Sequence, residues 1–156
     1  MFDLTGKNAL VTGASGGIGA AIARALHAQG AKVGLSGTRV APLEELAASL
    51  ANLSDAADTE RLAKEAEAAL GGIDILVINA GLTRDQLALR MKDEDWQTVL
   101  DVNLTAAFRL SRAALRGMMK RRWGRIVGIT SIVGVTGNPG QANYAASKAG
   151  LIGMSK

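Results

Sequence analysis

Two residues near the end of the chain carry side chains suited to proton transfer. Tyr144 and Lys148 are four positions apart in a segment of helical composition, so both side chains lie on one face of the expected helix. A nearby ammonium group favours the phenolate form of a tyrosine, which makes its hydroxyl a better proton donor near neutral pH. Taken singly, a pair at this spacing is more often an ordinary helix-surface contact.

A third polar residue, Ser131, lies thirteen positions before Tyr144 and just past an apolar segment that reads as a strand. Ligands of parallel α/β sheets bind at the carboxyl ends of the strands. The Ser131 hydroxyl is therefore placed to hold a substrate carbonyl oxygen. The alternative is a serine that only forms a turn or caps a helix.

A glycine-rich stretch at the other end of the chain, residues 7–19, reads KNALVTGASGGIG. A short apolar run precedes Gly13, Gly17 and Gly19, and an alanine-rich segment follows them. Strand, glycine turn and helix together form the arrangement that cradles a nucleotide phosphate. Glycines also make ordinary turns, so it is this context that favours dinucleotide binding.

Composition predicts one soluble globular domain over residues 1–156, with 48% apolar and 21% charged residues. The chain has no cysteine and a single histidine, His27, which excludes disulfides and thiolate or histidine-rich metal sites; we expect no metal. No uninterrupted apolar run approaches the roughly 18 residues that span a bilayer. The N-terminus, with Asp3, does not resemble a signal peptide. We therefore expect a cytoplasmic protein without membrane association.

The net charge of +4 suits an anionic ligand or an acidic partner. Basic residues cluster over Lys120–Arg125, where only Trp123 is interleaved with them. No nucleic-acid-binding motif is present, so we expect no nucleic-acid partner. The cluster is either a docking surface for an acidic protein or a solvated helix end.

Apolar runs and helical segments alternate along the chain, which predicts an α/β fold with a parallel sheet covered on both faces. The expected strands are Ala9–Val11, Lys32–Leu35, Ile73–Ile78 and Arg125–Ile129. The expected helices are Ser15–Gln29, Leu43–Leu50, a third capped by Ser54 or Asp55 and running to Leu70, Asp93–Leu100, Asn103–Met119 and Ala145–Met154.

One connection in this arrangement is too short. A doubly wound sheet needs a strand between the second and third helices, yet only Ala51–Ser54 separate them. Helices on opposite faces of a sheet lie about 20 Å apart, whereas four extended residues reach about 13–14 Å. We therefore expect that residues, and with them the third strand, are missing here.

These features together resemble the short-chain dehydrogenase/reductase family, whose fold is a Rossmann-type doubly wound parallel sheet. The similarity runs from the first strand to Lys156. The glycine spacing after Thr12 is that of the family, and Asn103 falls where the family has its fourth catalytic residue. Ser131 with Tyr144–Lys148 (YAASK) is similar to the family's serine and Y-x-x-x-K, and Asn79-Ala80-Gly81 to its N-N-A-G, with Ile78 replacing the first asparagine.

One branch of the family is similar in several further segments, the 3-oxoacyl-[acyl-carrier-protein] reductases. The segments are Gly81–Met91, Met118–Arg125 and Asn138–Lys148. This resemblance implies NADPH-dependent reduction of 3-oxoacyl thioesters in fatty-acid synthesis, an acidic acyl carrier protein as partner, and a homotetramer. The alternatives are another short-chain reductase with a different ketone or alcohol substrate, or a fragment that binds nucleotide without turnover.

The resemblance also implies roles for individual residues. Tyr144 would donate a proton to the ketone oxygen, Lys148 would make that tyrosine more acidic and hold the nicotinamide ribose, and Ser131 would orient the carbonyl. Asn103 would support a water-linked proton relay to Lys148. Cofactor contacts would come from Gly13, Ser15, Gly17, Ile18 and Gly19 at the pyrophosphate, from Asn79, Ala80 and Gly81, and from Asn52 and Leu53 beside the adenine.

The residues that follow the second expected strand indicate whether the cofactor is NADPH or NADH. An acid there would accept from a ribose 2′-hydroxyl and repel a 2′-phosphate, but this chain has Thr38 and Arg39 instead. A guanidinium pairs well with phosphate, so the sequence predicts NADPH over NADH. Arg39 could instead be a solvated turn residue, and Gly16 stands where many reductases of this branch have an arginine.

The family continues beyond the point where this chain stops at Lys156. It adds further strands, a Pro-Gly segment against the nicotinamide and a mobile substrate loop. We therefore expect a domain that lacks its C-terminal strands and leaves apolar surface uncovered on its last helices.

Overall fold

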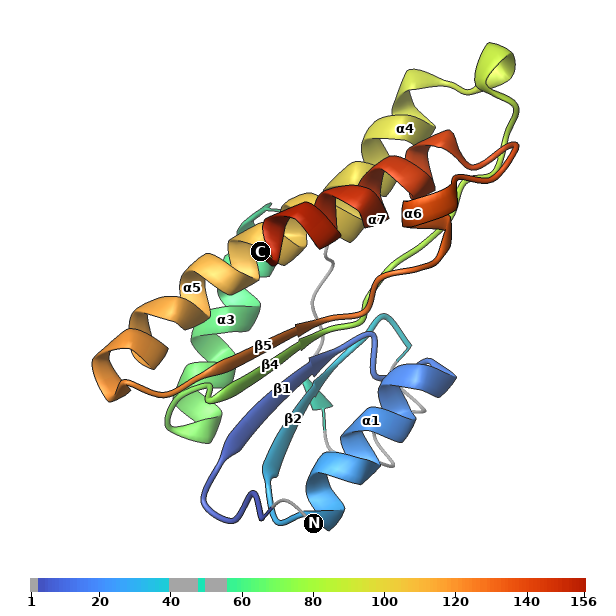
Figure 1. Ribbon diagram of the computed structural model, residues 1–156. Coiled ribbons are helices and arrows are strands. Elements are labelled where there is room, and N and C mark those ends of the chain that lie inside the picture. The colour runs from blue at the N-terminus through green and yellow to red at the C-terminus, as the bar shows by residue number, and fades with distance from the viewer. Residues whose placement is uncertain (1–2, 40–47, 50–55) are drawn as a thin grey trace.

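The computed structural model describes residues 3–39, 48–49 and 56–156 (Figure 1). Its strands form one parallel sheet in the order β3-β2-β1-β4-β5. The α/β Rossmann-type fold expected from the sequence is therefore confirmed. The strands are β1 (Asn8–Thr12), β2 (Lys32–Ser36), β3 (Ala48–Ser49), β4 (Ile75–Ile78) and β5 (Arg125–Gly128).

The third strand is present, which corrects two expectations. Ala48 and Ser49 pair with Leu35 and Ser36 of β2, so the helix predicted over Leu43–Leu50 is wrong at these two positions and the strand is short rather than missing. The edge of β2 offers backbone groups that an extended segment can pair with, and this tertiary pairing overrides the helix propensity of a segment rich in alanine and leucine. The rest of that predicted helix lies outside the described residues, as do Asn52 and Leu53.

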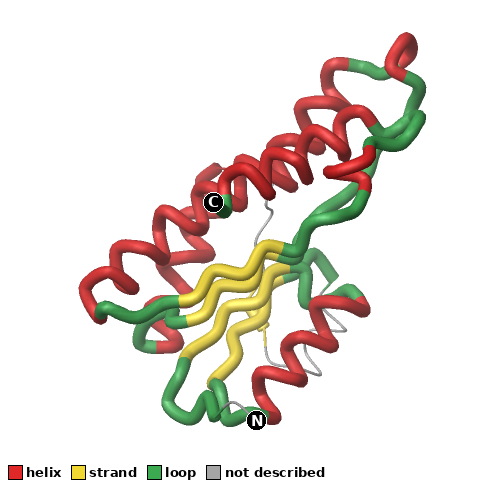
Figure 2. The backbone as a smooth tube through the Cα atoms, viewed as in Figure 1, coloured by secondary structure: helices red, strands yellow, loops and turns green. Residues whose placement is uncertain are grey.

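Helices cover both faces of the sheet (Figure 2). Ala9 and Val11 of β1 pack with Ala23 of α1 (Gly17–Ala28) on one face. Leu10 points to the other face, where it joins residues of α3 (Ala56–Leu70) and α5 (Ala106–Arg121). Alternate residues of one strand thus serve two cores, as in a parallel sheet buried on both sides.

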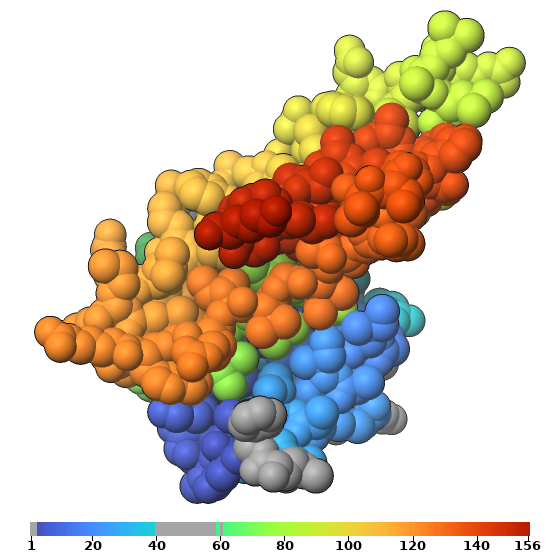
Figure 3. All heavy atoms as spheres, in the orientation of Figure 1, coloured from blue at the N-terminus to red at the C-terminus, as the bar shows by residue number. Residues whose placement is uncertain are grey.

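Beyond the carboxyl edge of the sheet the chain forms an arm (Figures 1 and 3). Its helices are α4 (Asp93–Leu100), α6 (Val133–Thr136) and α7 (Ala142–Met154), with a 3-10 turn at Ala88–Arg90. The two helices predicted over 93–100 and 103–119 form one continuous helical stretch. A π-helical turn, Asp101–Thr105, joins α4 to α5.

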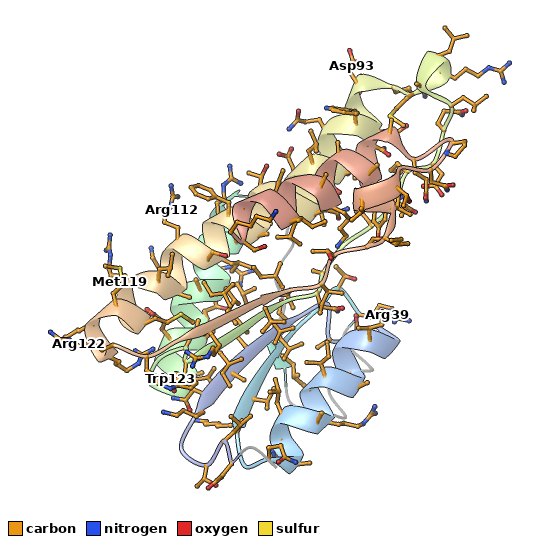
Figure 4. The ribbon with its side chains drawn as sticks, viewed as in Figure 1. Arg39, Asp93, Arg112, Met119, Arg122 and Trp123 are labelled. Carbon is orange, nitrogen blue, oxygen red and sulfur yellow. The ribbon has the colours of Figure 1, made fainter. Side chains whose placement is uncertain are left out.

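Apolar surface remains exposed on α5 and β5. Phe108, Leu115 and Met119 are exposed on α5, as are Ile126 and Val127 on β5. Figure 4 shows Met119 projecting from α5 away from the sheet. An apolar cavity of about 390 Å³ opens between α5, β5 and α7.

Candidate active site

The glycine turn after β1 is packed too tightly for side chains. Gly13 has φ of 64°, and a Cβ built on it would lie 2.8 Å from the Ala80 Cα. A Cβ on Gly19 would lie 2.7 Å from the Asn79 Nδ2 and would also collide with the Gly13 carbonyl. These two glycines let the turn lie directly against the segment that follows β4.

Thr12 and Asn79 fasten these two segments together. The Thr12 Oγ1 donates to the Val77 carbonyl at 3.2 Å and accepts from the backbone nitrogens of Asn79 and Ala80, each at 3.1 Å. The Asn79 Nδ2 donates to the carbonyls of Thr12 and Gly13, both at 3.1 Å. Neither structural role was predicted from the sequence, although both residues belong to the motifs singled out there.

A cavity of about 600 Å³ opens at this carboxyl edge of the sheet, a volume typical of small-molecule and cofactor sites. The N-terminus of α1 faces it, and Ile18, 63% exposed, supplies apolar surface beside it. Gly19 lies beneath the turn. The predicted cofactor residues that line the cavity are Gly13, Ser15, Gly17, Ile18, Thr38, Arg39, Asn79, Ala80 and Gly81.

Arg39 lies at the rim of this cavity, beside the N-terminal end of α1 (Figure 4). Its guanidinium donates to the backbone carbonyl of Ser15, so the side chain is held against the glycine turn. A guanidinium has five N–H donors. The remaining donors are available to an anion at the rim.

Lys148 and Asn103 lie beside Gly81, and the Tyr144 ring lies next to Lys148. The Lys148 Nζ lies 5.7 Å from the centroid of the Tyr144 ring and donates to the Ile129 carbonyl at 2.7 Å. A Cβ built on Gly81 would lie 3.2 Å from the Asn103 Oδ1 and 3.6 Å from the Lys148 Nζ. Asn103 and Lys148 thus lie directly behind Gly81, which lines the cavity, whereas Asn103, Ser131, Tyr144 and Lys148 are not themselves among its lining residues.

Asn103 is buried, and its side-chain amide is occupied by neighbours. Its Oδ1 accepts from the Leu82 nitrogen, and its Nδ2 donates to the Leu82 carbonyl and to the Ser147 Oγ. The Ser147 Oγ in turn donates to the Tyr144 carbonyl at 2.8 Å. One amide hydrogen is therefore engaged with the Leu82 segment and the other with α7, which leaves neither for the water of the relay that the resemblance implies.

Ser131 follows β5, and its Oγ accepts from the Val133 nitrogen at 3.2 Å. The alternative of a turn or cap serine is thus realised, while the residue also stands at the carboxyl end of a strand. Between Ser131 and Tyr144, both in the described part of the chain, there is no hydrogen bond. Gly134 packs directly on α7, because a Cβ there would lie 2.8 Å from the Lys148 carbonyl carbon.

Burial of the Lys148 ammonium lowers its pKa below the ordinary lysine value of 10.5. At pH values below this lowered pKa, both the folded and the unfolded chain carry the proton. Between the lowered pKa and 10.5 the unfolded chain alone retains it, so the free energy of unfolding rises with pH by up to about 1.4 kcal/mol per unit.

Lys148→Met should remove this rise. We expect the free energy of unfolding of the wild type, minus that of the variant, to increase as the pH is raised from 7 towards 10.5 in denaturant titrations. Lys120→Met changes an exposed lysine and should give a flat difference. A flat difference for Lys148→Met as well would contradict the buried ammonium.

Among the residues that the structure describes, no group of His, Asp and Glu side chains could hold a metal ion. Of the described helices, none is long and apolar enough to cross a membrane.

A sequence model of the family described as short chain dehydrogenase matches residues 7–156. The chain belongs to this family. Its members use nicotinamide cofactors, and the site fits such a group, since the turn excludes side chains at Gly13 and Gly19 while a Cβ on Gly17 would meet only open space.

Individual members of the family are also similar to the chain. Nodulation protein G of Rhizobium sp. (strain N33) is 65% identical over 164 residues, covering 100% of this chain and 67% of that protein. The 3-oxoacyl-[acyl-carrier-protein] reductase FabG of Rickettsia conorii (strain ATCC VR-613 / Malish 7) is 52% identical, with 100% and 66% covered. A putative short-chain alcohol dehydrogenase from Sinorhizobium meliloti 1021 has a TM-score of 0.93 at 36% identity, over 97% of this chain and 65% of that one.

The chain thus spans about two thirds of the length of these relatives. The matched stretch of 164 residues is eight longer than the 156 of this chain. The match with this relative therefore includes eight positions at which this chain has no residue.

Proposed function

We propose that the protein reduces 3-oxoacyl thioesters, carried by an acyl carrier protein, with NADPH. The observation that carries the proposal is the placement of Asn103 and Lys148 directly behind Gly81, a residue that lines the cavity, with the Tyr144 ring next to Lys148. The family resemblance and the 52% identity to a 3-oxoacyl-[acyl-carrier-protein] reductase support it.

In this mechanism the cofactor supplies the hydride, and the chain supplies position and a proton. Tyr144 donates its hydroxyl proton to the ketone oxygen. Lys148, fixed by the Ile129 carbonyl, favours the resulting phenolate through its positive charge. Ser131 orients the ketone oxygen, and Asn103 holds the Tyr144 turn through Ser147.

The surroundings of Ser131 suit an acyl substrate. Ile132 and Val135 are 70% and 71% exposed on the segment that Ser131 begins. Apolar side chains of this kind can bind an acyl chain by removing it from water. This supports a thioester with a hydrocarbon tail over a small polar ketone.

The Lys120–Arg125 cluster supports an acidic carrier as partner. Lys120 and Arg122 are exposed at the end of α5, where Figure 4 shows Arg122. The Arg125 guanidinium lies over the Trp123 ring, 5.1 Å from its centroid. Arg121 has a structural role instead, since its Nε donates to the Asp74 carboxylate at 3.0 Å. The remaining cations can attract an acidic protein surface.

The same helix supports a homo-oligomer, which we propose to be a tetramer. Exposed Phe108, Leu115 and Met119 give α5 an apolar stripe, and patches of this kind mark interfaces. Acidic residues open α4 at Asp93–Asp95, whereas α5 ends in basic ones. Two copies packed antiparallel along this stretch would bring opposite charges together.

Steady oxidation of NADPH, followed by its absorbance, tests the function. Acetoacetyl groups are offered on an acyl carrier protein and, separately, on a small thiol. The proposal expects turnover with both and a lower KM for the carrier-bound form. Turnover of other ketones alone would favour the second candidate, a short-chain reductase with a different substrate. The identity with Nodulation protein G, which is greater than that with the reductase FabG, is the reason to keep this candidate. Binding of NADPH without any turnover would favour a nucleotide-binding fragment.

Arg39→Ala tests the choice of cofactor. We expect the Kd for NADPH to rise about ten- to a hundred-fold, because a charge-assisted contact to the 2′-phosphate is lost, while the Kd for NADH changes less than about two-fold. Fluorescence titration of the reduced cofactors measures both. Arg24→Ala removes an exposed arginine of α1 and should alter neither value. Equal losses for both cofactors in Arg39→Ala would refute the phosphate contact.

A further inference from the structure

Asn143 is fully buried and stands directly before Tyr144, yet the site described so far gives it no role. Its Nδ2 donates to the carbonyls of Arg84 at 2.9 Å and Asp95 at 3.5 Å. Its Oδ1 accepts from the Tyr144 nitrogen at 2.8 Å. Because both partners of Nδ2 are carbonyl oxygens, the orientation of the amide is fixed.

These bonds join three separate parts of the arm. Arg84 belongs to the segment that lines the cavity after β4, Asp95 to α4, and Tyr144 to α7. The same seam is crossed at the surface by the bonds Gln86 N to Gly140 O and Gln141 Nε2 to Asp85 Oδ2. Those surface groups can bond water instead of one another. The carbonyls of Arg84 and Asp95 would lose a donor if the buried Asn143 amide were removed, and an unsatisfied buried carbonyl lowers the free energy of unfolding.

From this geometry we infer that Asn143 is a positioning residue, which sets the place of the Tyr144 hydroxyl by tying the first turn of α7 to the cavity wall at Arg84. The inference rests on the proposed function, in which Tyr144 is the proton donor. Proton transfer needs heavy atoms within about 2.6–3.2 Å, and a misplacement of about 1 Å can cost a hundred-fold in rate.

Asn143→Ser removes the bond to Arg84 and keeps a polar, uncharged side chain. The shorter serine does not reach the Arg84 carbonyl, which lies 2.9 Å from the Asn143 Nδ2. We expect kcat to fall about ten- to a hundred-fold, with KM and the Kd for NADPH changed less than about two-fold. Asn138→Ser is the matched control, because Asn138 makes an exposed bond to Gln141 at the same seam.

Asn143→Asp keeps the shape and adds a pH signature. A carboxyl group donates to a carbonyl only when it is protonated, and one buried against two carbonyls retains its proton to higher pH than usual. We therefore expect kcat of this variant, relative to wild type, to recover as the pH is lowered. A relative kcat that is independent of pH would count against the bond to Arg84.

A readout that needs no turnover is available because Tyr144 is the single tyrosine of the chain. In protein labelled with ¹³C-tyrosine, the ring resonances in an NMR spectrum therefore report on this one side chain. A changed position of the ring should shift these resonances in Asn143→Ser and leave them in place in Asn138→Ser.

The two readouts distinguish this inference from the proposed function. If the wild type does not oxidise NADPH but the Tyr144 ring resonances shift in Asn143→Ser alone, the reductase function fails and the positioning role stands. An unchanged kcat in an active enzyme, or unchanged Tyr144 resonances in an inactive one, overturns the positioning role.

Discussion

Tyr144→Phe is expected to lower kcat about a thousand-fold, within the range that removal of a general acid produces, and to change the Kd for NADPH less than about two-fold. The substitution removes only the hydroxyl and keeps the ring beside the Lys148 ammonium, 5.7 Å away. The fold should persist, because the side chain of Tyr144 makes no hydrogen bond to any other residue that the structure describes. Stopped-flow and steady-state absorbance of NADPH measure the chemical step and turnover.

A matched control removes a hydroxyl from the other end of the same helix. Ser155 donates to the Ile152 carbonyl at an exposed position, and Ser155→Ala should leave kcat and the Kd unchanged. If Tyr144→Phe kept more than a tenth of the wild-type kcat, the proton would have to come from another donor, and the mechanism proposed here would be wrong.

Gly19→Ala is expected to lower the free energy of unfolding by about 2–3 kcal/mol and to abolish measurable dinucleotide binding. The added Cβ would stand 2.7 Å from the Asn79 Nδ2 and 2.9 Å from the Ala14 Cα, and overpacking of this kind costs about 1–3 kcal/mol. Relief of the clash would move Asn79 away from the Gly13 carbonyl and deform the cavity rim. Denaturant titration and cofactor fluorescence measure the two effects.

Substitutions at two other glycines serve as controls for the two effects expected of Gly19→Ala. A Cβ on Gly153, in α7, meets nothing within 4 Å. Gly153→Ala should therefore raise the free energy of unfolding by about 0.5–1 kcal/mol, because alanine has the higher helix propensity. A Cβ on Gly17 also meets nothing, but Gly17 lines the cavity. Gly17→Ala should therefore keep its stability and lose affinity for the dinucleotide. Normal binding by Gly19→Ala would show that the turn is looser than the structure has it.

The parts of the fold that the sequence predicts are those determined by residues close together in the sequence. A run such as Ile73–Ile78 can only be a buried strand or a buried helix segment, and the glycines after it and before it decide between them. Gly13, Gly17 and Gly19 predict the turn between β1 and α1 because their spacing has a local cause, the geometry of strand, turn and helix. Arg39 is found at the cavity rim for the same reason, since it follows the strand beside that turn.

The unpredicted parts depend on partners that are distant in sequence. Nothing near Asn103 indicates that it bonds Leu82 and Ser147, which are 21 and 44 residues away. Asn143 likewise finds Arg84 at a separation of 59 residues. The π-helical turn at Asp101–Thr105 was also not predicted, because one extra residue in a helical turn does not change the helix propensity of the segment.

The bond between Thr12 and Asn79 has a consequence for how the chain folds. It joins residues 67 apart, and the closure of long loops delays folding more than local contacts do. Helix α1 and strand β2 can form while the first forty residues leave the ribosome, but the glycine turn acquires its final shape only when residues 77–80 arrive. We therefore expect the proposed nucleotide binding to develop late in the folding of this domain, and partially folded chains to carry the motif without the ability to hold a nucleotide.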